Sequence, residues 1–298
     1  MACPDCFSGF ERTDAKPAGT ETTVFGLPTY VAKAAGGSDN TTAAAPKGII
    51  VIIADLFGWQ FVNNRLLADT YAAAGYRVYV PDFMAGRAAK PWLLDTLQTL
   101  LTPSKTWSEA VVSKSPAVFW ALVGASSALW FNWPSASFPR VRSFFEQLRA
   151  EQASQADSGG GGAGGLKIGV AGFCWGGKHT VTLTHKENSH LIDAAFTAHP
   201  SFLSLPADMD RVRKPLAIAL GSKDNLLSVE QVQHAEKALL KLANQFPDQL
   251  KGKTEVRIYE GAGHGFSSRI DRRNDKQVDQ ARECEAQAIA WFDRLLVV

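Results

Sequence analysis

A chain of 298 residues, 46% of them hydrophobic, is long enough to bury a complete core, as one large α/β domain or two small ones. Its 31 basic and 29 acidic residues leave a formal net charge of +2, and no basic run is longer than Arg272-Arg273, which argues against a nucleic-acid-binding surface. The 4 cysteines do not make a disulfide framework at this length, and the start shows no secretory-signal pattern. A reducing cytoplasm is therefore the expected location.

Residues 1–20 are polar and contain proline and glycine, a composition typical of a loose N-terminal arm. Cys3 and Cys6 in this arm have the spacing of half a metal site or of a redox pair. No second Cys/His pair completes a zinc site, and no thioredoxin pattern surrounds them. We interpret the two cysteines as incidental and expect no metal site.

Residues 21–298 are expected to form a single domain, which opens with a hairpin and a buried strand. Thr22–Phe25 and Leu27–Ala32 alternate in polarity, which predicts an edge hairpin. The aliphatic run over residues 48–54 is typical of a strand buried on both faces of a parallel sheet. Ligands in open α/β sheets bind at the carboxyl ends of strands, so Asp55 and Phe57, which follow this run, are candidates for the wall of a site.

A helix over Asn63–Ala74 and a strand over Tyr76–Val80 are predicted next, and Trp92–Leu101 has a helical pattern. The run Ala117–Trp133 is uncharged and apolar. Its length is at the lower limit for a membrane span, and no basic cluster flanks it. We therefore expect a helical cap insertion over about residues 103–137 that covers a pocket or forms an interface, with a membrane anchor as the alternative.

A predicted amphipathic helix, Phe138–Ala153, and a flexible surface loop, Ser154–Gly165, lead to the most informative stretch of the chain. An apolar run enters Cys174, which has Gly172 and Gly176 two positions to either side. This is the pattern of a strand–turn–helix elbow, in which the neighbouring backbone leaves no room for Cβ atoms at the two glycines. The elbow sets the sulfur at a helix N-terminus, where the dipole favours thiolate. A small buried core cysteine is the alternative interpretation of this motif alone.

Strands and helices continue to alternate after the elbow. The predicted strands are Leu191–Ala198, Pro215–Leu220 and Thr254–Tyr259, and the predicted helices are Val229–Asn244 and Asp275–Leu296. This alternation indicates an α/β fold with one mostly parallel sheet covered by helices on both faces.

A thiolate nucleophile needs a base, and the base needs a carboxylate to orient it. In α/β-hydrolases the acid and then the histidine follow the nucleophile, each on a loop after a later strand. Asp224 lies 50 residues after Cys174 and follows one predicted strand, and His264 lies 40 residues further and follows the next. We therefore expect Cys174, Asp224 and His264 to meet at one sheet edge as a catalytic triad. Viewed alone, Asp224 could be a turn or helix-capping residue, and His264 a loop histidine.

Other residues near these strand ends have expected roles. The backbone N–H groups of Leu56 and Trp175 are predicted to form an oxyanion hole. His199 ends a predicted strand and is a candidate for the pocket wall, whereas His179 lies inside the helix after the elbow and is expected to point elsewhere. Two further carboxylates compete for the orienting role, although no strand immediately precedes them: Asp208 and Asp210.

The chain resembles the eukaryotic branch of the dienelactone hydrolase (carboxymethylenebutenolidase) family nearly end to end. The motifs that carry the resemblance are Asp55-Leu-Phe-Gly58, Pro81-Asp-Phe83, Gly172-Phe-Cys-Trp-Gly-Gly177, Gly221-Ser-Lys-Asp224 and Gly263-His-Gly-Phe266. The resemblance implies a single α/β-hydrolase domain, no cofactor, and a Cys-Asp-His triad that opens an enol-lactone through an acyl-thioester. It also implies that Phe266 lies at the substrate site.

The sequence departs from the family pattern in two respects. Bacterial relatives have a glutamate that holds the resting thiol where this chain has Asp55, and the shorter aspartate is expected to weaken or abolish that switch. Those relatives also bind the substrate carboxylate with two arginines. Arg87 and Arg269 lie near the corresponding positions but are displaced along the sequence. Each is either a substrate ligand or a solvated surface charge.

The sequence thus predicts a cytoplasmic hydrolase of small lactones or activated esters. It is expected to be a monomer or homodimer with a small-molecule substrate, without a nucleic-acid or membrane partner. Two other functions stay open. One is a broad carboxylesterase or thioesterase for larger acyl groups, and the other is a non-catalytic α/β-hydrolase relative that binds through Ala117–Trp133.

Overall fold

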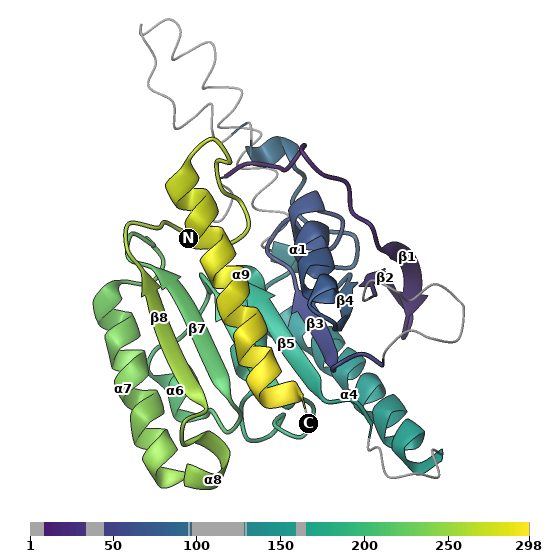
Figure 1. Cartoon of the computed structure of the whole chain (residues 1–298). Helices are drawn as coiled ribbons and strands as arrows, with labels where there is room; N and C mark the ends of the chain where they lie inside the picture. Colours follow the sequence, from purple (N-terminus) through teal and green to yellow (C-terminus); the bar gives the residue numbers. More distant parts are fainter. Residues whose placement is uncertain are drawn as a thin grey trace, which may run out of the picture.

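The computed structural model describes residues 9–33, 45–94, 96, 128, 130–158 and 165–297. Within these residues, eight strands form one sheet in the order β1-β2-β4-β3-β5-β6-β7-β8 (Figure 1). The strands are β1 (Thr20–Val24), β2 (Leu27–Ala32), β3 (Ile49–Ile53), β4 (Arg77–Pro81), β5 (Ile168–Phe173), β6 (Ala194–Ala198), β7 (Leu216–Gly221) and β8 (Thr254–Tyr259). β1 and β2 pair antiparallel, and β2 pairs antiparallel with β4. The six remaining strands in the sheet order, β4, β3, β5, β6, β7 and β8, run parallel to one another. The sheet is therefore mixed but mostly parallel, as the sequence predicts.

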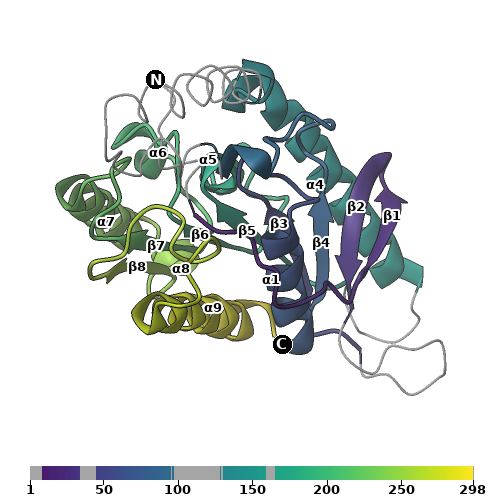
Figure 2. The same ribbon diagram turned by 90° about the horizontal axis from the view of Figure 1, so that it is seen from above.

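Helices cover both faces of this sheet (Figure 2). They are α1 (Val62–Ala73), α4 (Pro134–Ser158), α5 (Trp175–Leu183), α6 (Ala207–Asp210), α7 (Val229–Gln245), α8 (Pro247–Leu250) and α9 (Asp275–Leu296). Side chains of α1 and α9 pack in the core on one face, and those of α4, α5 and α7 pack in the core on the other. The fold is thus a mostly parallel sheet between two layers of helices.

The position of β3 in the sheet explains why its sequence is an unbroken aliphatic run. Alternate residues of a strand point to opposite faces of the sheet. Val51 and Ile53 lie in the core beneath α4 and α5, whereas Ile50 and Ile52 lie in the core beneath α1 and α9. All five residues of β3 are buried, because helices cover both faces.

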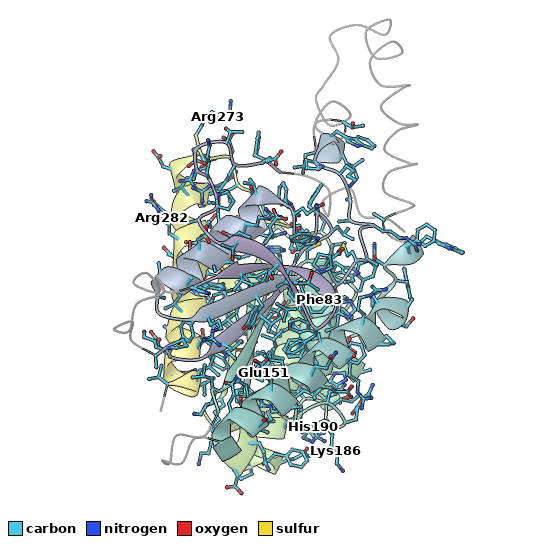
Figure 3. The ribbon with its side chains drawn as sticks, turned by 90° about the vertical axis from the view of Figure 1, so that its right-hand side faces the viewer. Phe83, Glu151, Lys186, His190, Arg273 and Arg282 are labelled. Carbon is cyan, nitrogen blue, oxygen red and sulfur yellow. The ribbon has the colours of Figure 1, made fainter. Side chains whose placement is uncertain are left out.

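Aromatic side chains form part of the core beside α4, and arginine side chains project from the surface. Figure 3 shows Phe83 inside the molecule, whereas Arg273 and Arg282 project outward. Phe83 is 2% exposed and makes an edge-to-face contact with Phe144 of α4 at 5.5 Å between ring centroids. The rings under α4 therefore belong to one continuous core.

α4 extends by several residues beyond its predicted bounds at both ends. α4 begins at Pro134, before the predicted start at Phe138, and it continues to Ser158 through residues predicted as loop. Residues 154–158, SQADS, contain no glycine or proline, so nothing in them ends the helix, and the glycine-rich run begins only at Gly159. The predicted loop boundary at Ser154 was wrong for this reason.

Residues 1–20 were predicted to form a loose arm before the domain, and the described part of that arm contacts α1. The amide side chain of Asn63 donates to the Phe10 carbonyl at 2.8 Å, and its oxygen accepts from the backbone N–H of Arg12 at 2.7 Å. The same amide donates to the carbonyl of Ser268 at 2.7 Å. One buried amide therefore joins the arm to the segment that follows His264.

Several expectations concern residues outside the described part of the chain. They are the pair Cys3 and Cys6, most of the helical pattern at Trp92–Leu101, and most of the expected cap over residues 103–137 with the run Ala117–Trp133. Among the helices in the described residues, none is long and apolar enough to cross a membrane.

Candidate active site

The elbow at Cys174 has the backbone strain that its flanking glycines predict. Cys174 joins β5 to α5 with φ of 51° and ψ of −112°, outside the regions that non-glycine residues prefer. A Cβ atom at Gly172 would lie 2.0 Å from Thr180 Oγ1, and one at Gly176 would lie 2.0 Å from the Ile53 carbonyl oxygen. Only glycine fits at these two positions. The close approach of β3 and α5 thus fixes the turn that carries the sulfur.

Asp224 and His264 meet at the carboxyl end of the parallel strands. Asp224 follows β7 and His264 follows β8, and these two strands are neighbours. His264 Nδ1 lies 2.9 Å from Asp224 Oδ2, and both side chains are fully buried. The other carboxylate oxygen of Asp224 accepts from the backbone N–H of Leu226 at 2.9 Å. The carboxylate is therefore held in one orientation and fixes the imidazole in turn.

A serine that the sequence analysis did not identify lies between the thiol and the imidazole. Ser201 Oγ is 3.3 Å from Cys174 Sγ and 3.5 Å from His264 Nε2. Ser201 follows the end of β6, which is the direct neighbour of β5 in the sheet. The rule that pointed to Asp224 and His264, a polar residue just after a parallel strand, applies equally to Ser201.

The neighbours of His264 raise its pKa despite its burial. Burial lowers its pKa, but the negative charge of the Cys174 thiolate and the hydrogen bonds to Asp224 and Cys174 outweigh burial and raise the pKa to about 10. An imidazolium next to a thiolate is the ion pair expected of an activated cysteine nucleophile.

His199 packs beside His264 after the end of β6. It is fully buried, its Nε2 lies 2.9 Å from Ser267 Oγ, and its ring is 5.0 Å from that of His264. Burial and the nearby charge of His264 hold the pKa of His199 well below its ordinary value. Phe266 packs 5.9 Å away against the same ring. His199 is therefore a neutral packing partner.

Asp55 and Arg269 form an ion pair at the end of β3. Both side chains are fully buried, and Arg269 Nη1 donates to Asp55 Oδ2. Asp55 Oδ1 also accepts from the backbone N–H of Phe57 at 3.1 Å and from Asn64 Nδ2 at 3.0 Å. The Arg269 guanidinium lies 5.5 Å over the Phe57 ring. The alternative that Arg269 is a solvated surface charge is wrong.

Arg87, the second arginine expected to bind substrate, lies differently. Its side chain is exposed, and its guanidinium packs 4.2 Å over the ring of Phe131. Its carbonyl accepts from Asn132 Nδ2 at 2.9 Å. Of the two expected arginines, only Arg269 is therefore buried, and it pairs with Asp55.

The two expected oxyanion donors belong to adjacent strand ends. Leu56 follows β3 and Trp175 is the first residue of α5 after β5, and β3 pairs directly with β5. The N–H groups in the first turn of a helix have no acceptor within the helix, so that of Trp175 is available to a developing negative charge. The indole of Trp175 is fixed by a 2.6 Å hydrogen bond from its Nε1 to the Asn132 carbonyl.

His179 and the competing carboxylate Asp208 lie apart from the imidazole of His264. His179 points toward α4, where its Nε2 lies 3.1 Å from Ser137 Oγ, and burial lowers its pKa to about 3. Asp208 accepts from Lys178 Nζ at 2.7 Å in an ion pair between α6 and α5. The expectation that His179 points away from the site agrees with these contacts.

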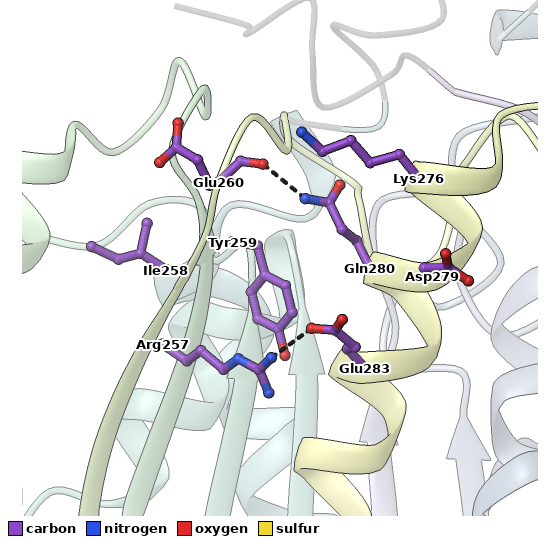
Figure 4. A pocket seen from close by; sticks show the side chains of 8 residues that line it. All are labelled: Arg257, Ile258, Tyr259, Glu260, Lys276, Asp279, Gln280 and Glu283. Carbon is purple, nitrogen blue, oxygen red and sulfur yellow. Dashed lines mark hydrogen bonds and ion pairs between the residues drawn. The ribbon is translucent and has the colours of Figure 1, made fainter.

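A separate groove of about 510 Å³ lies between β8 and α9 and contains none of the residues above (Figure 4). Its Arg257 pairs with Glu283 at 2.5 Å, and Gln280 donates to the Glu260 carbonyl at 2.9 Å. Within the described part of the chain, no group of three or more His, Cys, Asp and Glu side chains could hold a metal ion. The residues around Cys174 therefore form the candidate site.

The model of the dienelactone hydrolase family matches residues 141–296, which is more than half of the chain. The chain belongs to the dienelactone hydrolase family. Hydrolase pyvD of Aspergillus violaceofuscus is 26% identical over 277 residues, covering 93% of this chain and 90% of the relative. The carboxymethylenebutenolidase homolog of Mus musculus is 24% identical over 249 residues, covering 82% of this chain and 81% of the relative.

A solved structure shares the fold. The putative dienelactone hydrolase of Klebsiella pneumoniae superposes with a TM-score of 0.57 at 21% identity, covering 92% of this chain and 98% of that one. The family resemblance and the α/β-hydrolase fold predicted from the sequence are thereby confirmed. The chain is a hydrolase of this family.

Proposed function

We propose that this dienelactone hydrolase family member cleaves small lactones or activated esters through a Cys174–His264–Asp224 triad and an acyl-thioester. The observation that supports this most directly is the continuous contact from Asp224 through His264 and Ser201 to Cys174. These residues are far apart in the sequence and share one rim of the sheet.

The ion pair carries out the acylation half of the reaction. The Cys174 sulfur attacks the carbonyl carbon, and the π electrons of that bond move to the oxygen, which accepts from the N–H groups of Leu56 and Trp175. When the carbonyl re-forms, the carbon–oxygen bond to the leaving group breaks, and His264 Nε2 donates its proton to that oxygen. The products are a thioester on Cys174 and a neutral imidazole oriented by Asp224.

The same imidazole serves the deacylation half. His264 Nε2 takes a proton from water as the hydroxyl oxygen attacks the thioester carbon, and the carbon–sulfur bond then breaks to regenerate the thiolate and the imidazolium. An enol leaving group favours this route, because the enol oxygen that His264 protonates is a weak nucleophile and does not re-attack the thioester. Lactones and activated esters therefore suit this site better than amides.

In this proposal, Arg269 can bind a substrate carboxylate only if its ion pair with Asp55 breaks. Arg269 is already balanced by the Asp55 carboxylate, and both are buried. Arg87 is exposed and packs over Phe131. These contacts favour neutral lactones and esters over substrates that need two bound arginines.

Replacing Cys174 with alanine tests the proposal. We expect Cys174→Ala to reduce hydrolysis of an activated aryl ester or a small enol-lactone to the rate without protein. Cys284→Ala is the matched control, because Cys284 is also a fully buried cysteine but lies in α9 outside the triad, and this variant should keep its activity. Retained turnover in Cys174→Ala would exclude the thioester mechanism.

A broader esterase or thioesterase is the second candidate, and an aromatic cluster favours it. Trp133 is 54% exposed, and its ring lies 5.5 Å from that of Phe202, the residue after Ser201. Apolar rings beside the nucleophile suit a longer acyl chain. A series of aryl esters of rising acyl length distinguishes the two functions. The broader activity is supported if kcat/KM of the wild type rises with acyl length and kcat/KM of Trp133→Ala does not.

A non-catalytic role predicts an inert thiol. Fast, pH-dependent alkylation of Cys174 by iodoacetamide, with loss of activity in proportion, supports the enzyme. Slow alkylation without any turnover of either substrate class supports the binding protein.

A further inference from the structure

Ser201 is held against the nucleophile by its backbone as well as by its side chain. Its N–H donates to the Cys174 carbonyl at 2.8 Å, and the Cys174 N–H donates to the carbonyl of Ala198 at 3.3 Å. A Cβ atom at Gly177 would lie 2.4 Å from the Cβ of Pro200, so the loop after β6 is wedged against the first turn of α5. Ser201 is only 2% exposed. Its hydroxyl therefore has few positions available.

Charge strengthens the hydrogen bonds among the three groups in one protonation state. A serine hydroxyl donates one hydrogen bond and accepts others. In a thiolate–imidazolium pair, Ser201 donates to the sulfur of Cys174 and accepts from His264 Nε2–H, so both contacts are satisfied at once. In the neutral pair, the thiol donates to Ser201 and Ser201 donates to Nε2, so both contacts are also made, but neither partner carries the charge that strengthens a hydrogen bond.

We propose that Ser201 is a positioning residue that holds Cys174 as a thiolate against His264 in the resting protein. This inference rests on the proposed function, in which Cys174 is the nucleophile. It adds a fourth side chain to that site, and this side chain acts through the sulfur without forming a bond to the substrate.

The other charged and titratable groups at this rim leave this role to Ser201. Asp224 bonds to Nδ1, on the opposite side of the His264 ring from Ser201. His199 is neutral and bonds to Ser267. Asp55 and Arg269 neutralise each other, and Lys178 in α5 pairs with Asp208. Ser201 and His264 both form hydrogen bonds with the sulfur of Cys174.

The role changes during turnover. As the Cys174 sulfur forms its bond to the substrate carbon, its negative charge passes to the carbonyl oxygen, and the hydrogen bond from Ser201 to sulfur weakens. The bond strengthens again when the carbon–sulfur bond breaks in deacylation and the charge returns to sulfur. Ser201 therefore favours the thiolate both as the resting nucleophile and as the leaving group.

The test measures the thiol pKa directly, from the pH dependence of the iodoacetamide rate at Cys174. Mass spectrometry of the Cys174 peptide separates this reaction from alkylation of Cys3, Cys6 and Cys284. We expect Ser201→Ala and Ser201→Gly to raise the thiol pKa by about 1 to 2 pH units, because a hydrogen bond to a charged group is lost. The acid limb of kcat/KM should move upward by the same amount.

Two further variants separate the hydroxyl from general packing. Ser201→Thr keeps the hydroxyl, and its thiol pKa should stay close to the wild-type value. Thr184→Val removes another buried hydroxyl, which donates to the Val181 carbonyl at the far end of α5, and it should leave the thiol pKa unchanged. If Ser201→Ala does not fold, the glycine variant provides the same measurement.

An unchanged thiol pKa in folded Ser201→Ala or Ser201→Gly overturns the inference, as does an equal shift in Ser201→Thr. Neither result affects the proposed function, which fails instead if Cys174→Ala keeps its turnover. The two failures are therefore distinguished by different variants.

Discussion

His264 carries its charge because two neighbours outweigh its burial. The thiolate of Cys174 stabilises the imidazolium through Nε2, and Asp224 stabilises it through Nδ1. Because the pKa lies near 10, the proton needed by the leaving group is present at neutral pH and is lost only in alkaline solution.

The pH dependence of kcat/KM should therefore be bell-shaped with an alkaline limb near pH 10, since this ratio reports on the free enzyme. Replacing Asp224 with asparagine removes a contact that raises the His264 pKa, so the limb should move to lower pH. The same change should reduce kcat by roughly 10²- to 10⁴-fold, because the imidazole tautomer is no longer fixed. An alkaline limb that stays in place in Asp224→Asn would contradict the assignment.

The Asp55–Arg269 pair makes a prediction about stability. Removing one partner leaves a buried charge without compensation, so Asp55→Asn should lower the free energy of unfolding by about 3–5 kcal/mol. Glu146→Gln is the control, because it breaks an exposed pair with Arg142 one turn away on α4 and should cost below about 0.5 kcal/mol. Urea unfolding measures both. Equal losses of unfolding free energy in the two variants would show that burial does not determine how much the Asp55–Arg269 pair contributes to stability.

At the scale of elements, the elbow depends on the close approach of α5 to β3. Gly176→Ala would drive a Cβ atom to 2.0 Å from the backbone oxygen of Ile53, which cannot move without disturbing the central sheet. We expect this variant to lose both turnover and most of its folded yield. Gly252→Ala is the control, because a Cβ atom there meets no atom within 4 Å.

The control should cost only about 1–2 kcal/mol, for the positive φ of 68° at Gly252. Circular dichroism and thermal melting of the two variants, measured side by side, check this pair of expectations. A Gly176→Ala protein as stable and active as Gly252→Ala would refute the steric account of the elbow.

Local sequence predicted most elements, and it failed where the signal was weak. The last helix, Asp275–Leu296, has the predicted bounds because its apolar stripe is continuous and the Asn274 side chain accepts from the Gln277 N–H at its start. The start of α4 was missed because it continues directly from an apolar segment whose composition suggested a separate cap. Its end was missed because serine and glutamine are compatible with both helix and loop.

At the scale of the whole molecule, the convergence of Cys174, Asp224 and His264 could be predicted because parallel strands end at one edge. Ser201 shares that edge, but a serine after a strand is too common to single out. The ion pair between Asp55 and Arg269 spans 214 residues and depends on how a loop turns after His264. Neither periodicity nor spacing encodes such a turn.

The end of the sheet opposite the triad should be important for stability and unimportant for catalysis. Phe292 of α9 is fully buried between Tyr71, Tyr76 and Phe196, with ring centroids 6.4–6.5 Å apart. It also packs close to Gly169, at the beginning of β5, whereas Cys174 follows the end of that strand.

Phe292→Ala should therefore lower the free energy of unfolding by about 3–5 kcal/mol. The kcat/KM of the folded fraction should be retained, because the cavity opens away from the triad. Chemical denaturation, with kinetics at a temperature where the variant is folded, tests both halves. A large loss of kcat/KM at full folding would show that this packing reaches the site.

Three non-glycine residues on the two loops around the sulfur have positive φ: Cys174 at 51°, His199 at 40° and Phe202 at 63°. Such conformations cost of order 1–3 kcal/mol each, so these loops are the segments with most to gain from relaxing. On gradual warming, the loops should relax before the sheet melts. Catalytic activity should then disappear at a lower temperature than the secondary structure, and cooling should restore it.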